Sequence, residues 1–424
     1  MTVLELKNTI EGGFPAYEQL YAHTPKGKER LSAAADRFVS VFGEGGELSL
    51  FSVSGRSETI GNHTDHNRGC VIAAAIDKDV IAVAAPNDSG KVRLLSEGYD
   101  MIEVDLSLID DPAAFENYSS AALIAGVMAG FLKNGHRIGG YDAYLTSNVL
   151  KGSGLSSSAA FEVMIGNINN HFYNDGEVSA VELAQIAQFA ENEFFGKPCG
   201  LMDQMACAVG GFVFIDFEDP AAPVIEPISP AALSEAGYML CTVNTGGNHA
   251  DLNEDYASVP AEMKAVASLL GKEVLRGTAE GELLAKAAEI RATLGDRALL
   301  RAIHFIRENE RVAEAKKALK AGNIPAFFDC ICASGHSSFE YLQNVYTVKA
   351  VEEQGLSLAL ALTDGFMQAH EGAFRVHGGG FAGTILAFVK EQDFPSYQQL
   401  LDSVFGEGST VGLWVRPLGA TRLL

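Results

Sequence analysis

The chain has 424 residues, of which 47% are hydrophobic and 20% are charged, a composition typical of globular proteins with two or three domains. Its formal net charge of −23 argues against a nucleic-acid partner, which needs a basic face, and against binding to anionic membranes. A phosphate site in so acidic a chain must depend on local backbone dipoles, a few cations and Mg²⁺.

The cysteines and the N-terminus indicate the compartment. None of the six cysteines forms a C-x-x-C pair, and their spacing fits neither a zinc site nor a disulfide framework. Free thiols are typical of a reducing compartment. The first residues lack a signal-peptide core, and no run approaches the ~18 apolar residues of a membrane span. We therefore expect a cytoplasmic protein without membrane partners.

The first half of the chain mixes strand patterns with helix patterns. Strands are predicted over 48–54, 70–85, 92–106 (one or two strands), 141–148, 211–217 and 238–244. Helices are predicted over 118–132, 155–172 and 179–195. The last of these helices begins with Ser179 and Glu182, which have the form of a capping box, and ends at Gly196.

The second half is mainly helical. Periodicity predicts helices over 280–294, 297–321 and 351–370, and short strands over 374–376, 384–389 and 412–415. The absence of a regular βαβ rhythm favours an α+β fold over a doubly wound sheet. A Pro-rich segment, 219–230, is the best candidate for a junction between domains at 1–218 and 219–424.

Residues 152–160, Gly-Ser-Gly-Leu-Ser-Ser-Ser-Ala-Ala, form the most informative stretch. Glycine lets backbone approach a ligand closely, and the predicted helix behind this loop would direct unpaired N–H groups and a positive dipole at it. These features suit phosphate, and a serine hydroxyl there could bind Mg²⁺. No Gly-Lys-Ser/Thr follows, so this is not a Walker motif. A simple connection between elements is the alternative.

A second polar stretch, residues 55–66, lies between two predicted strands. Its Asn, His and Asp side chains could hydrogen-bond several hydroxyls of one polyol, because each hydroxyl both donates and accepts. The alternative is a polar turn. His63 and His66 also suggest a metal, but the spacing supplies no convincing third ligand.

Two further stretches could carry chemistry. Asp203 is a lone acid between Leu201-Met202 and the apolar run beyond Gln204. Beside a cation it could accept or orient a hydroxyl proton, although a turn or N-cap aspartate is the common case. Residues 376–384 contain four glycines within six residues before a predicted strand, which allows backbone to pack on a ligand or on another loop.

The order of these four stretches resembles the GHMP kinases, and within them the galactokinases, from about Phe51 to Gly383. The galactokinase signature is similar to G-R-x-N-L-I-G-E-H-T-D-Y. Residues 55–56, 60–61 and 63–65 match it. The family's G-L-S-S-S-A-A is fully present, and P-C-G-I-M-D-Q is matched by residues 198–204. The late G-A-G-F-G-G loop is matched by residues 378–383.

The resemblance implies specific roles on the sugar side. Arg56 would stabilise charge near the sugar C1 oxygen and the transferring phosphate, and Asp203 would be the catalytic base. The residues implied to contact the sugar are Asn62, His63, Asp65, Gly200 and Tyr256.

It also implies how ATP and Mg²⁺ are held. The residues implied to surround the ATP phosphates are Gly152, Ser153, Gly154, Leu155, Ser156, Ser157 and Ser158. Ser158, with Ser157 as the alternative, would bind Mg²⁺, and Glu191 would be a second Mg²⁺ contact. Family members resemble ribosomal protein S5 domain 2 in the first half and have a ferredoxin-like second half. The implied activity is ATP-dependent phosphorylation of a sugar at C1, in a monomer or weak homodimer.

Several positions depart from the family pattern. Asn62 replaces a glutamate that contacts the sugar C6 hydroxyl in the family, His66 replaces a tyrosine, and Leu150 replaces a proline. Residues 244–251 lack the family's basic stretch, and the Arg-Arg pair expected after Tyr256 is missing.

The departure at Asn62 leaves the sugar open. D-galactose leads, and galacturonate, N-acetylgalactosamine and L-arabinose are alternatives, because a hydrogen-bonding site can discriminate strongly between related substrates. A sugar sensor without activity is a further alternative. The intact Ser158, Ala159, Arg56 and Asp203 argue against a sensor, and His63-Thr64-Asp65 argues against a non-sugar alcohol such as mevalonate.

Overall fold

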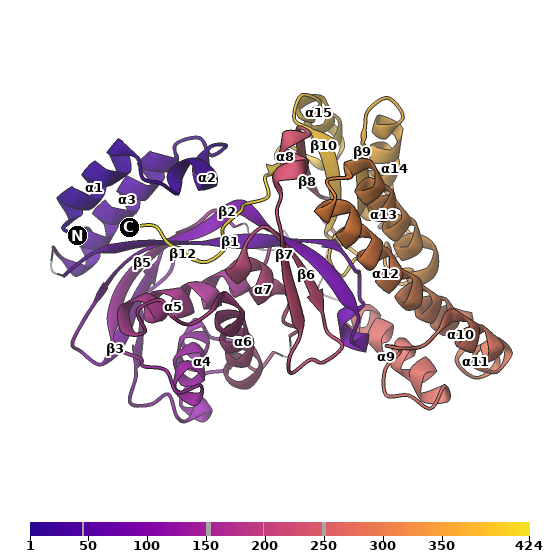
Figure 1. Ribbon diagram of the computed structural model, residues 1–424, viewed down its shortest axis with the longest axis horizontal. Coiled ribbons are helices and arrows are strands. Elements are labelled where there is room, and N and C mark those ends of the chain that lie inside the picture. The colour runs from indigo at the N-terminus through magenta and orange to yellow at the C-terminus, as the bar shows by residue number, and fades with distance from the viewer. Residues whose placement is uncertain (45, 150–153, 198, 248–251) are drawn as a thin grey trace.

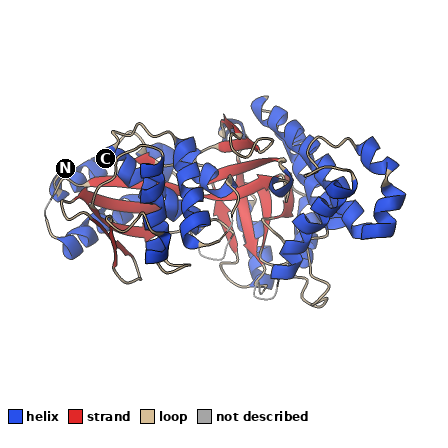
Figure 2. Cartoon of the chain, turned by 90° about the horizontal axis from the view of Figure 1, so that it is seen from below, coloured by secondary structure: helices blue, strands red, loops and turns tan. Residues whose placement is uncertain are grey.

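The computed structural model describes residues 1–44, 46–149, 154–197, 199–247 and 252–424. These residues form two sheets with helices packed around each, arranged along the length of the molecule (Figures 1 and 2). The N- and C-termini lie close together at one end (Figure 1).

The larger sheet has eight strands in the order β12-β1-β2-β5-β3-β4, with β6 paired to β2 and β7 paired to β6. All of these pairs are antiparallel except β3 with β5. The strands are β1 (Ser49–Ile60), β2 (Cys70–Pro86), β3 (Lys91–Ser96), β4 (Ile102–Asp105), β5 (Tyr141–Ser147), β6 (Phe212–Asp216), β7 (Val224–Ile228) and β12 (Thr421–Arg422).

Both faces of this sheet are buried because successive side chains on a strand point to opposite sides. On β2, Ile81 and Val83 belong to the apolar cluster of the N-terminal helices, whereas Ala82 and Ala84 belong to the main core. The N-terminal helices are α1 (Val3–Gly12), α2 (Tyr17–Tyr21) and α3 (Gly27–Phe42). The helices on the other face are α4 (Ser120–Lys133), α5 (Ser157–Tyr173), α6 (Ala180–Ala190) and α7 (Met202–Val209) (Figure 1).

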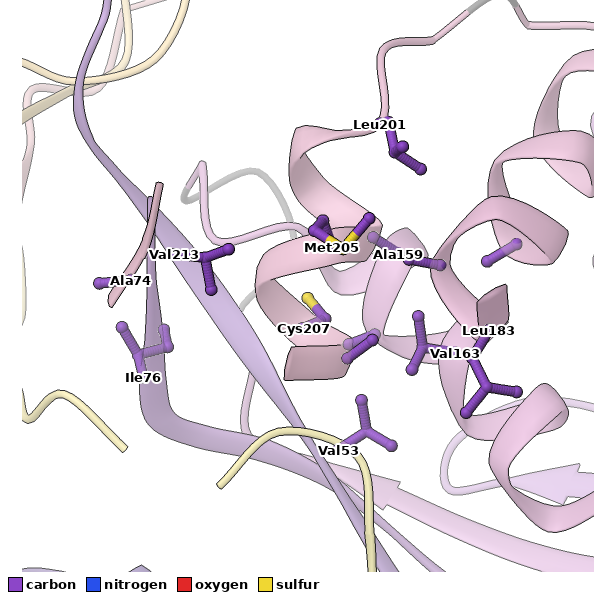
Figure 3. Packing of buried hydrophobic residues seen from close by; sticks show 14 of the residues in the cluster. Val53, Ala74, Ile76, Ala159, Val163, Leu183, Leu201, Met205, Cys207 and Val213 are labelled. Carbon is purple, nitrogen blue, oxygen red and sulfur yellow. The ribbon is translucent and has the colours of Figure 1, made fainter. Parts of the chain in front are cut away.

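Helix α7 lies in the main core and packs against both the sheet and α5 (Figure 3). Its Met205 and Cys207 are fully buried and pack among Val53 of β1 and Ala159 and Val163 of α5. Because burying an aliphatic side chain contributes roughly 1.5–3 kcal/mol, this packing fixes the starts of α5 and α7 relative to β1.

The smaller sheet is antiparallel, in the order β11-β8-β10-β9. Its strands are β8 (Tyr238–Asn244), β9 (Gly372–Val376), β10 (Thr384–Lys390) and β11 (Thr410–Leu413). One face packs through Leu386 and Phe388 on α13 (Ile324–Ser337), and the other face packs on α14 (Gly355–Met367) and α15 (Phe394–Phe405).

The remaining helices extend away from the larger sheet (Figure 1). Helix α12 (Asp296–Lys320) runs beside α13 and packs with α9 (Asn253–Leu269) and α11 (Ala287–Leu294). The short elements are α8 (Ala231–Glu235), α10 (Glu280–Ala285), the 3₁₀-helices η1 (Asp65–Asn67) and η2 (Pro112–Ala114), and the π-turns η3 (Glu191–Phe195) and η4 (Ser338–Leu342).

The predicted α+β class is confirmed, and the predicted strands and helices are present with shifted ends. The predicted helix 280–294 is divided into α10 and α11, and α6 ends at Ala190, where the π-turn η3 continues to Phe195. The sequence patterns missed the N-terminal helices, α7, α8, α9, α13 and α15, and the strands β7 and β12. Strand β7 lies inside the Pro-rich segment and pairs with β6, so the proposed junction near residue 219 stays a prediction.

Candidate active site

An arginine–aspartate pair joins β1 to the start of α7. Arg56 donates from Nε to Oδ1 of Asp203 at 2.7 Å and from Nη2 to Oδ2 at 2.8 Å, a bidentate geometry typical of strong ion pairs. The Arg56 Nη1 also donates to the carbonyl of Gly154. Two of the five guanidinium N–H groups have no partner among the residues that the structure describes.

Asp203 is ionised but still reachable. Burial by itself would raise the pKa of Asp203, but the charge and hydrogen bonds of Arg56, together with the Ser156 hydroxyl, outweigh burial and hold that pKa below its ordinary value. A third of the Asp203 side-chain surface remains exposed. The carboxylate can therefore contact a ligand at neutral pH.

The strand that carries Arg56 is irregular around the site. The register of β1 against β2 shifts between Ser54 and Arg56 and again between Glu58 and Ile60. Such irregularities redirect side chains and are frequent beside active sites.

The loop before α5 contacts the same strand. The Arg56 amide donates to the Leu155 carbonyl at 3.0 Å, and a Cβ on Gly55 would come within 2.8 Å of that oxygen. Leu155 is buried in the core, whereas Gly154 has a left-handed backbone with φ +71°. Glycine at position 55 thus allows the phosphate-type loop to lie directly against β1.

The start of α5 presents hydroxyls and backbone donors. Ser156 is its N-cap residue, makes no side-chain cap, and donates its hydroxyl to Asp203. The first N–H groups of a helix have no partners within the helix, and these suit an anion. Ser157 is half-buried and Ser158 is exposed. Gly152 and Ser153, predicted to contact phosphate, lie outside the described residues, as does Leu150.

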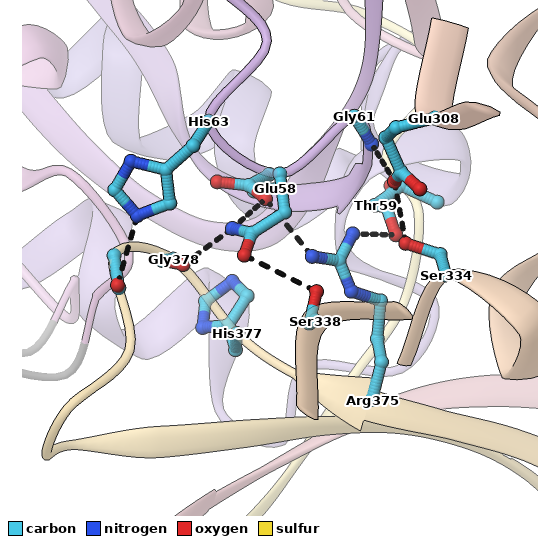
Figure 4. A network of polar contacts seen from close by, with 12 residues as sticks. Glu58, Thr59, Gly61, His63, Glu308, Ser334, Ser338, Arg375, His377 and Gly378 are labelled. Atoms are coloured by element: carbon cyan, nitrogen blue, oxygen red, sulfur yellow. Dashed lines mark hydrogen bonds and ion pairs between the residues drawn. The ribbon is translucent and has the colours of Figure 1, made fainter. Parts of the chain in front are cut away.

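The sugar-type loop lies against the glycine-rich loop of the second half (Figure 4). His63 has a left-handed backbone, with φ 58°, and its Nε2 donates to the Gly379 carbonyl at 2.9 Å. Asn62 Nδ2 donates to the Gly378 carbonyl at 2.7 Å. Burial lowers the pKa of His63, so the ring is neutral at pH 7 and its Nδ1 is left as an acceptor.

A cavity of about 180 Å³ lies beside these residues. Its lining includes Arg56, Glu58, Asn62, His63 and Asp65. Arg56 and the sugar-type side chains therefore face one space, as the sequence motif predicts.

Asp65 and Gly200 meet near this cavity. A Cβ on Gly200 would lie 3.1 Å from Oδ2 of Asp65, so the turn before α7 runs directly beside the carboxylate. His66 is exposed, and its Nε2 lies 3.6 Å from Oδ1 of Asp65. Sugar contacts by Asp65 and Gly200 stay predictions.

Tyr256 is placed on α9, against the same glycine-rich loop. Its hydroxyl donates to the Gly380 carbonyl at 2.9 Å, and its ring meets Phe381 edge to face at 5.4 Å. Tyr256 thereby supports the loop that holds His63 and Asn62. The predicted contact between Tyr256 and the sugar stays a prediction.

Sequence patterns missed a buried polar network behind the loop (Figure 4). Arg375 of β9 is fully buried and contacts Glu58 Oε1 at 3.3 Å and the Thr59 carbonyl at 3.1 Å. Glu308 of α12 accepts from the Gly61 amide at 3.0 Å and from Ser334 at 2.5 Å. No local motif marks Arg375 or Glu308, because their contacts with β1 and the loop after it join segments more than 240 residues apart.

Two further buried histidines support the site. His304 Nε2 donates to the Asn62 carbonyl at 3.0 Å, and His377 bonds the hydroxyls of Ser57 and Thr384 at 3.1 and 2.8 Å. Burial lowers the pKa of His304 to about 4 and that of His377 to about 3. Both rings are neutral at pH 7 and act as fixed hydrogen-bonding struts.

The predicted magnesium contact Glu191 is buried within a small acidic group. Gln204 Nε2 donates to Glu191 at 2.9 Å and to Glu162 at 3.1 Å, and Lys197 lies 3.1 Å from Glu191. Burial and the charge of Glu191 raise the pKa of Glu162 to about 8. One Glu162 oxygen is buried without a partner among the described residues. Those residues contain no cluster of three or more acidic, His or Cys side chains suited to a metal.

Comparison with known proteins gives the family. Residues 36–86 match the galactokinase galactose-binding signature, and residues 122–211 match the GHMP kinases N terminal domain. Galactokinase from Enterococcus faecalis is 32% identical over 368 residues, which are 85% of this chain and 90% of the relative. The chain belongs to the galactokinase family. Galactokinase from Streptomyces coelicolor is 30% identical over 384 residues, 89% of this chain and 94% of the relative.

Solved structures agree with this assignment. The structure of Lactococcus lactis galactokinase complexed with galactose is 26% identical, has a TM-score of 0.76, and is covered completely by 93% of this chain. A mevalonate kinase structure is 16% identical and has a TM-score of 0.59, and the match covers 86% of this chain and 98% of the other. At this identity the likeness shows the fold alone. The predicted GHMP kinase fold is thus confirmed. No helix in the described part of the chain is long and apolar enough to cross a membrane.

Proposed function

We propose that this protein transfers the terminal phosphoryl group of ATP to the C1 hydroxyl of D-galactose, which gives α-D-galactose 1-phosphate. The observation that carries the proposal is the Arg56–Asp203 pair. It stands between the start of α5, which suits phosphate, and the cavity lined by the residues of the galactose-binding signature.

Asp203 would bind the reacting hydroxyl. Because its pKa is held low, Asp203 is a weak base and acts mainly by orienting the hydroxyl and accepting its proton late in the reaction. Phosphoryl transfer tolerates a weak base because its transition state depends mainly on positioning and charge stabilisation.

Arg56 would stabilise the charge on the transferring group. Its two N–H groups without a partner among the described residues are free to donate to phosphate oxygens while its other three hold Asp203 and Gly154. Removal of one such preorganised donor costs about 10²–10³ in kcat in a well-studied case. The N–H groups at the start of α5 would add donors to the phosphates.

In this proposal Mg²⁺ would be held by oxygen donors at the start of α5 and on Glu191. Ser158 supplies an exposed hydroxyl, and Glu191 supplies a carboxylate next to the partnerless oxygen of Glu162. Such hard oxygen ligands are the ones that Mg²⁺ prefers. When bound, the metal supplies neutralisation of phosphate charge.

ADP release with Mg·ATP across a panel of sugars tests the proposed function. The panel holds galactose, galacturonate, N-acetylgalactosamine and L-arabinose. We expect turnover with galactose and loss of its reducing end, because phosphorylation at C1 blocks ring opening. Turnover only with another sugar would overturn the assignment of galactose as the substrate. Galactose binding without any turnover would indicate a sensor. A cytoplasmic location and a monomer or weak homodimer are proposed with this function.

A further inference from the structure

The amide of Asn62 has no hydrogen-bonding capacity left for a ligand. Its Nδ2 donates to Glu58 Oε1 at 2.9 Å and to the Gly378 carbonyl at 2.7 Å. Its Oδ1 accepts from Asn344 at 2.7 Å and from Ser338 at 3.3 Å. A primary amide has two donor hydrogens and two acceptor sites, so all four are used. With 1% of its surface exposed, Asn62 is a part of the wall rather than a free contact.

Glu58 lies next to Asn62 and, unlike Asn62, keeps a hydrogen-bond acceptor that no described residue uses. Its Oε1 holds Asn62 and Arg375, whereas its Oε2 has no hydrogen-bond partner among the described residues. Figure 4 shows this second oxygen on the side of His63, away from Arg375. Glu58 is 7% exposed and lines the same cavity as Arg56 and His63. This oxygen is not among the buried atoms that lack a partner in the described part of the chain, so it is reached from the cavity and can accept a hydrogen bond from a ligand hydroxyl.

The sequence motif agrees with this geometry. In G-R-x-N-L-I-G-E-H-T-D-Y, asparagine stands at the position of Glu58 and glutamate at the position of Asn62. The two residues are in contact here, so their exchange keeps one carboxylate and one amide in the pair and moves the charge four positions along the chain. Each half of the exchange alone would leave the pair with two carboxylates or with none.

We propose that Glu58 provides the carboxylate that binds a sugar hydroxyl, and that Asn62 positions Glu58. The proposal rests on the proposed galactose kinase activity and specifies its sugar site. Arg375 balances the charge of Glu58 from the fully buried side. The carboxylate remains at this wall of the cavity, so a sugar with its own carboxylate, such as galacturonate, meets a like charge and is disfavoured.

Reciprocal exchange tests the pair. The proteins are the wild type, Glu58→Asn, Asn62→Glu and the double variant, each assayed for galactose KM, ATP KM and kcat. We expect each single variant to raise the galactose KM by about tenfold to a hundredfold, as for a lost hydrogen bond to a charged group, while the ATP KM changes little. The double variant should recover galactose binding. Its increase in galactose KM over the wild type should be at least about tenfold smaller than the product of the two single increases. If the increase in galactose KM of the double variant equals the product of the two single increases, Asn62 does not position Glu58.

The isosteric variant Glu58→Gln gives a second, independent measurement. Wild type and variant are compared on galactose and on its 2-, 3-, 4- and 6-deoxy derivatives. If Glu58 binds one hydroxyl, the wild type penalises the derivative that lacks it, and Glu58→Gln loses that one penalty while the others persist. An unchanged pattern in a folded variant would refute the contact. Asp142→Asn is the matched control, because it breaks a similar pair, with Arg93 at 2.6 Å, away from the cavity.

Calorimetry of galactose binding separates this proposal from the proposed function. A wild type that binds galactose through Glu58 without turnover would refute the kinase activity and keep the sugar contact. A wild type that phosphorylates galactose, with a galactose KM that does not change in the Glu58 variants, would confirm the kinase activity and refute the sugar contact of Glu58.

Discussion

The two sides of the site are built differently. The phosphate side, formed by Arg56, Gly154, Ser156 and Asp203, is held by contacts among elements of the first half of the chain. The sugar side, formed by residues 58–65, is held largely by the second half, through His304, Asn344, Arg375 and the glycine-rich loop.

This difference separates chemistry from selectivity. The groups that stabilise phosphoryl transfer are hydrogen-bonded to one another within the first half, so these bonds can stay constant while the sugar side changes. The sugar side depends on the packing of two halves, so a substitution in either half can alter which hydroxyls are held. Perturbations of the two sides should therefore have separable effects on kcat and on the galactose KM.

The largest expected effect is on the phosphate side. Asp203→Asn removes the carboxylate that orients the hydroxyl, and we expect kcat to fall by about 10²–10⁴, as for loss of a general base. Asparagine can still hydrogen-bond the C1 hydroxyl, and the residues of the sugar-type loop are unchanged, so galactose affinity measured by calorimetry should change little. An Asp203→Asn variant with near wild-type kcat would refute the base assignment and with it the division between the two sides.

The next effect is on the sugar side. Gly380 has φ +81°, and a Cβ there would lie 2.0 Å from the carbonyl oxygen of Asn344. Gly380→Ala should therefore cost about 1–2 kcal/mol of backbone strain and about 1–3 kcal/mol of overpacking in unfolding free energy. The displaced loop should raise the galactose KM more than it lowers kcat, measured by urea unfolding and steady-state kinetics.

Gly378→Ala is its matched control. Gly378 also has a left-handed backbone, with φ +66°, but no described atom lies within 4 Å of its Cβ position. Gly378→Ala should therefore lose only the backbone-strain part of the unfolding free energy, about 1–2 kcal/mol. Equal losses in the two variants would mean that contact with Asn344 does not shape the loop.

The same division explains what sequence could predict. The phosphate side is encoded in contiguous motifs, and Arg56, residues 154–158 and Asp203 come together in the structure as those motifs predict. The same kind of motif selects residues 62, 63 and 65, which line one cavity, and their contacts with the sugar stay predictions. The role of Asn62 was harder, because the motif does not reveal that Ser338 and Asn344 saturate its amide.

The supports of the sugar side could not be predicted. Arg375 and His304 lie in ordinary strand and helix patterns, and only the packing of the two halves brings them to β1 and its loop. Glu58 did have a local signal, which is the exchange of Asn and Glu within the signature. That signal acquires a physical meaning only when the two side chains are seen in contact.

The smallest expected effect is a pH dependence of stability that comes from a histidine on the sugar side. Burial lowers the pKa of His304 from an ordinary value near 6.5 to about 4, and near neutrality its ring bonds the Asn62 carbonyl and the Ser337 hydroxyl. Between these two pH values the unfolded chain binds the proton and the folded chain does not. The contribution of His304 to stability is therefore lost as the pH falls from about 6.5 to about 4, by up to about 1.4 kcal/mol per pH unit, and His304 causes no further loss below that.

His304→Gln should flatten that part of the stability curve, because glutamine keeps a hydrogen-bonding side chain but does not titrate. Urea unfolding at half-unit pH steps measures the slope for both proteins. Burial also lowers the pKa of His377, on the other side of the glycine-rich loop, so a smaller slope should persist in the variant. Glu308 contributes chiefly below this window, since the nearby Arg311, His304 and Arg375 charges and the Ser334 hydroxyl overcome burial and hold its pKa at about 2, so that its stabilisation is lost as the pH falls from about 4.5 to about 2. An unchanged slope in His304→Gln would show that this histidine is not a neutral strut, and the sugar side would then lose one of its connections to the second half.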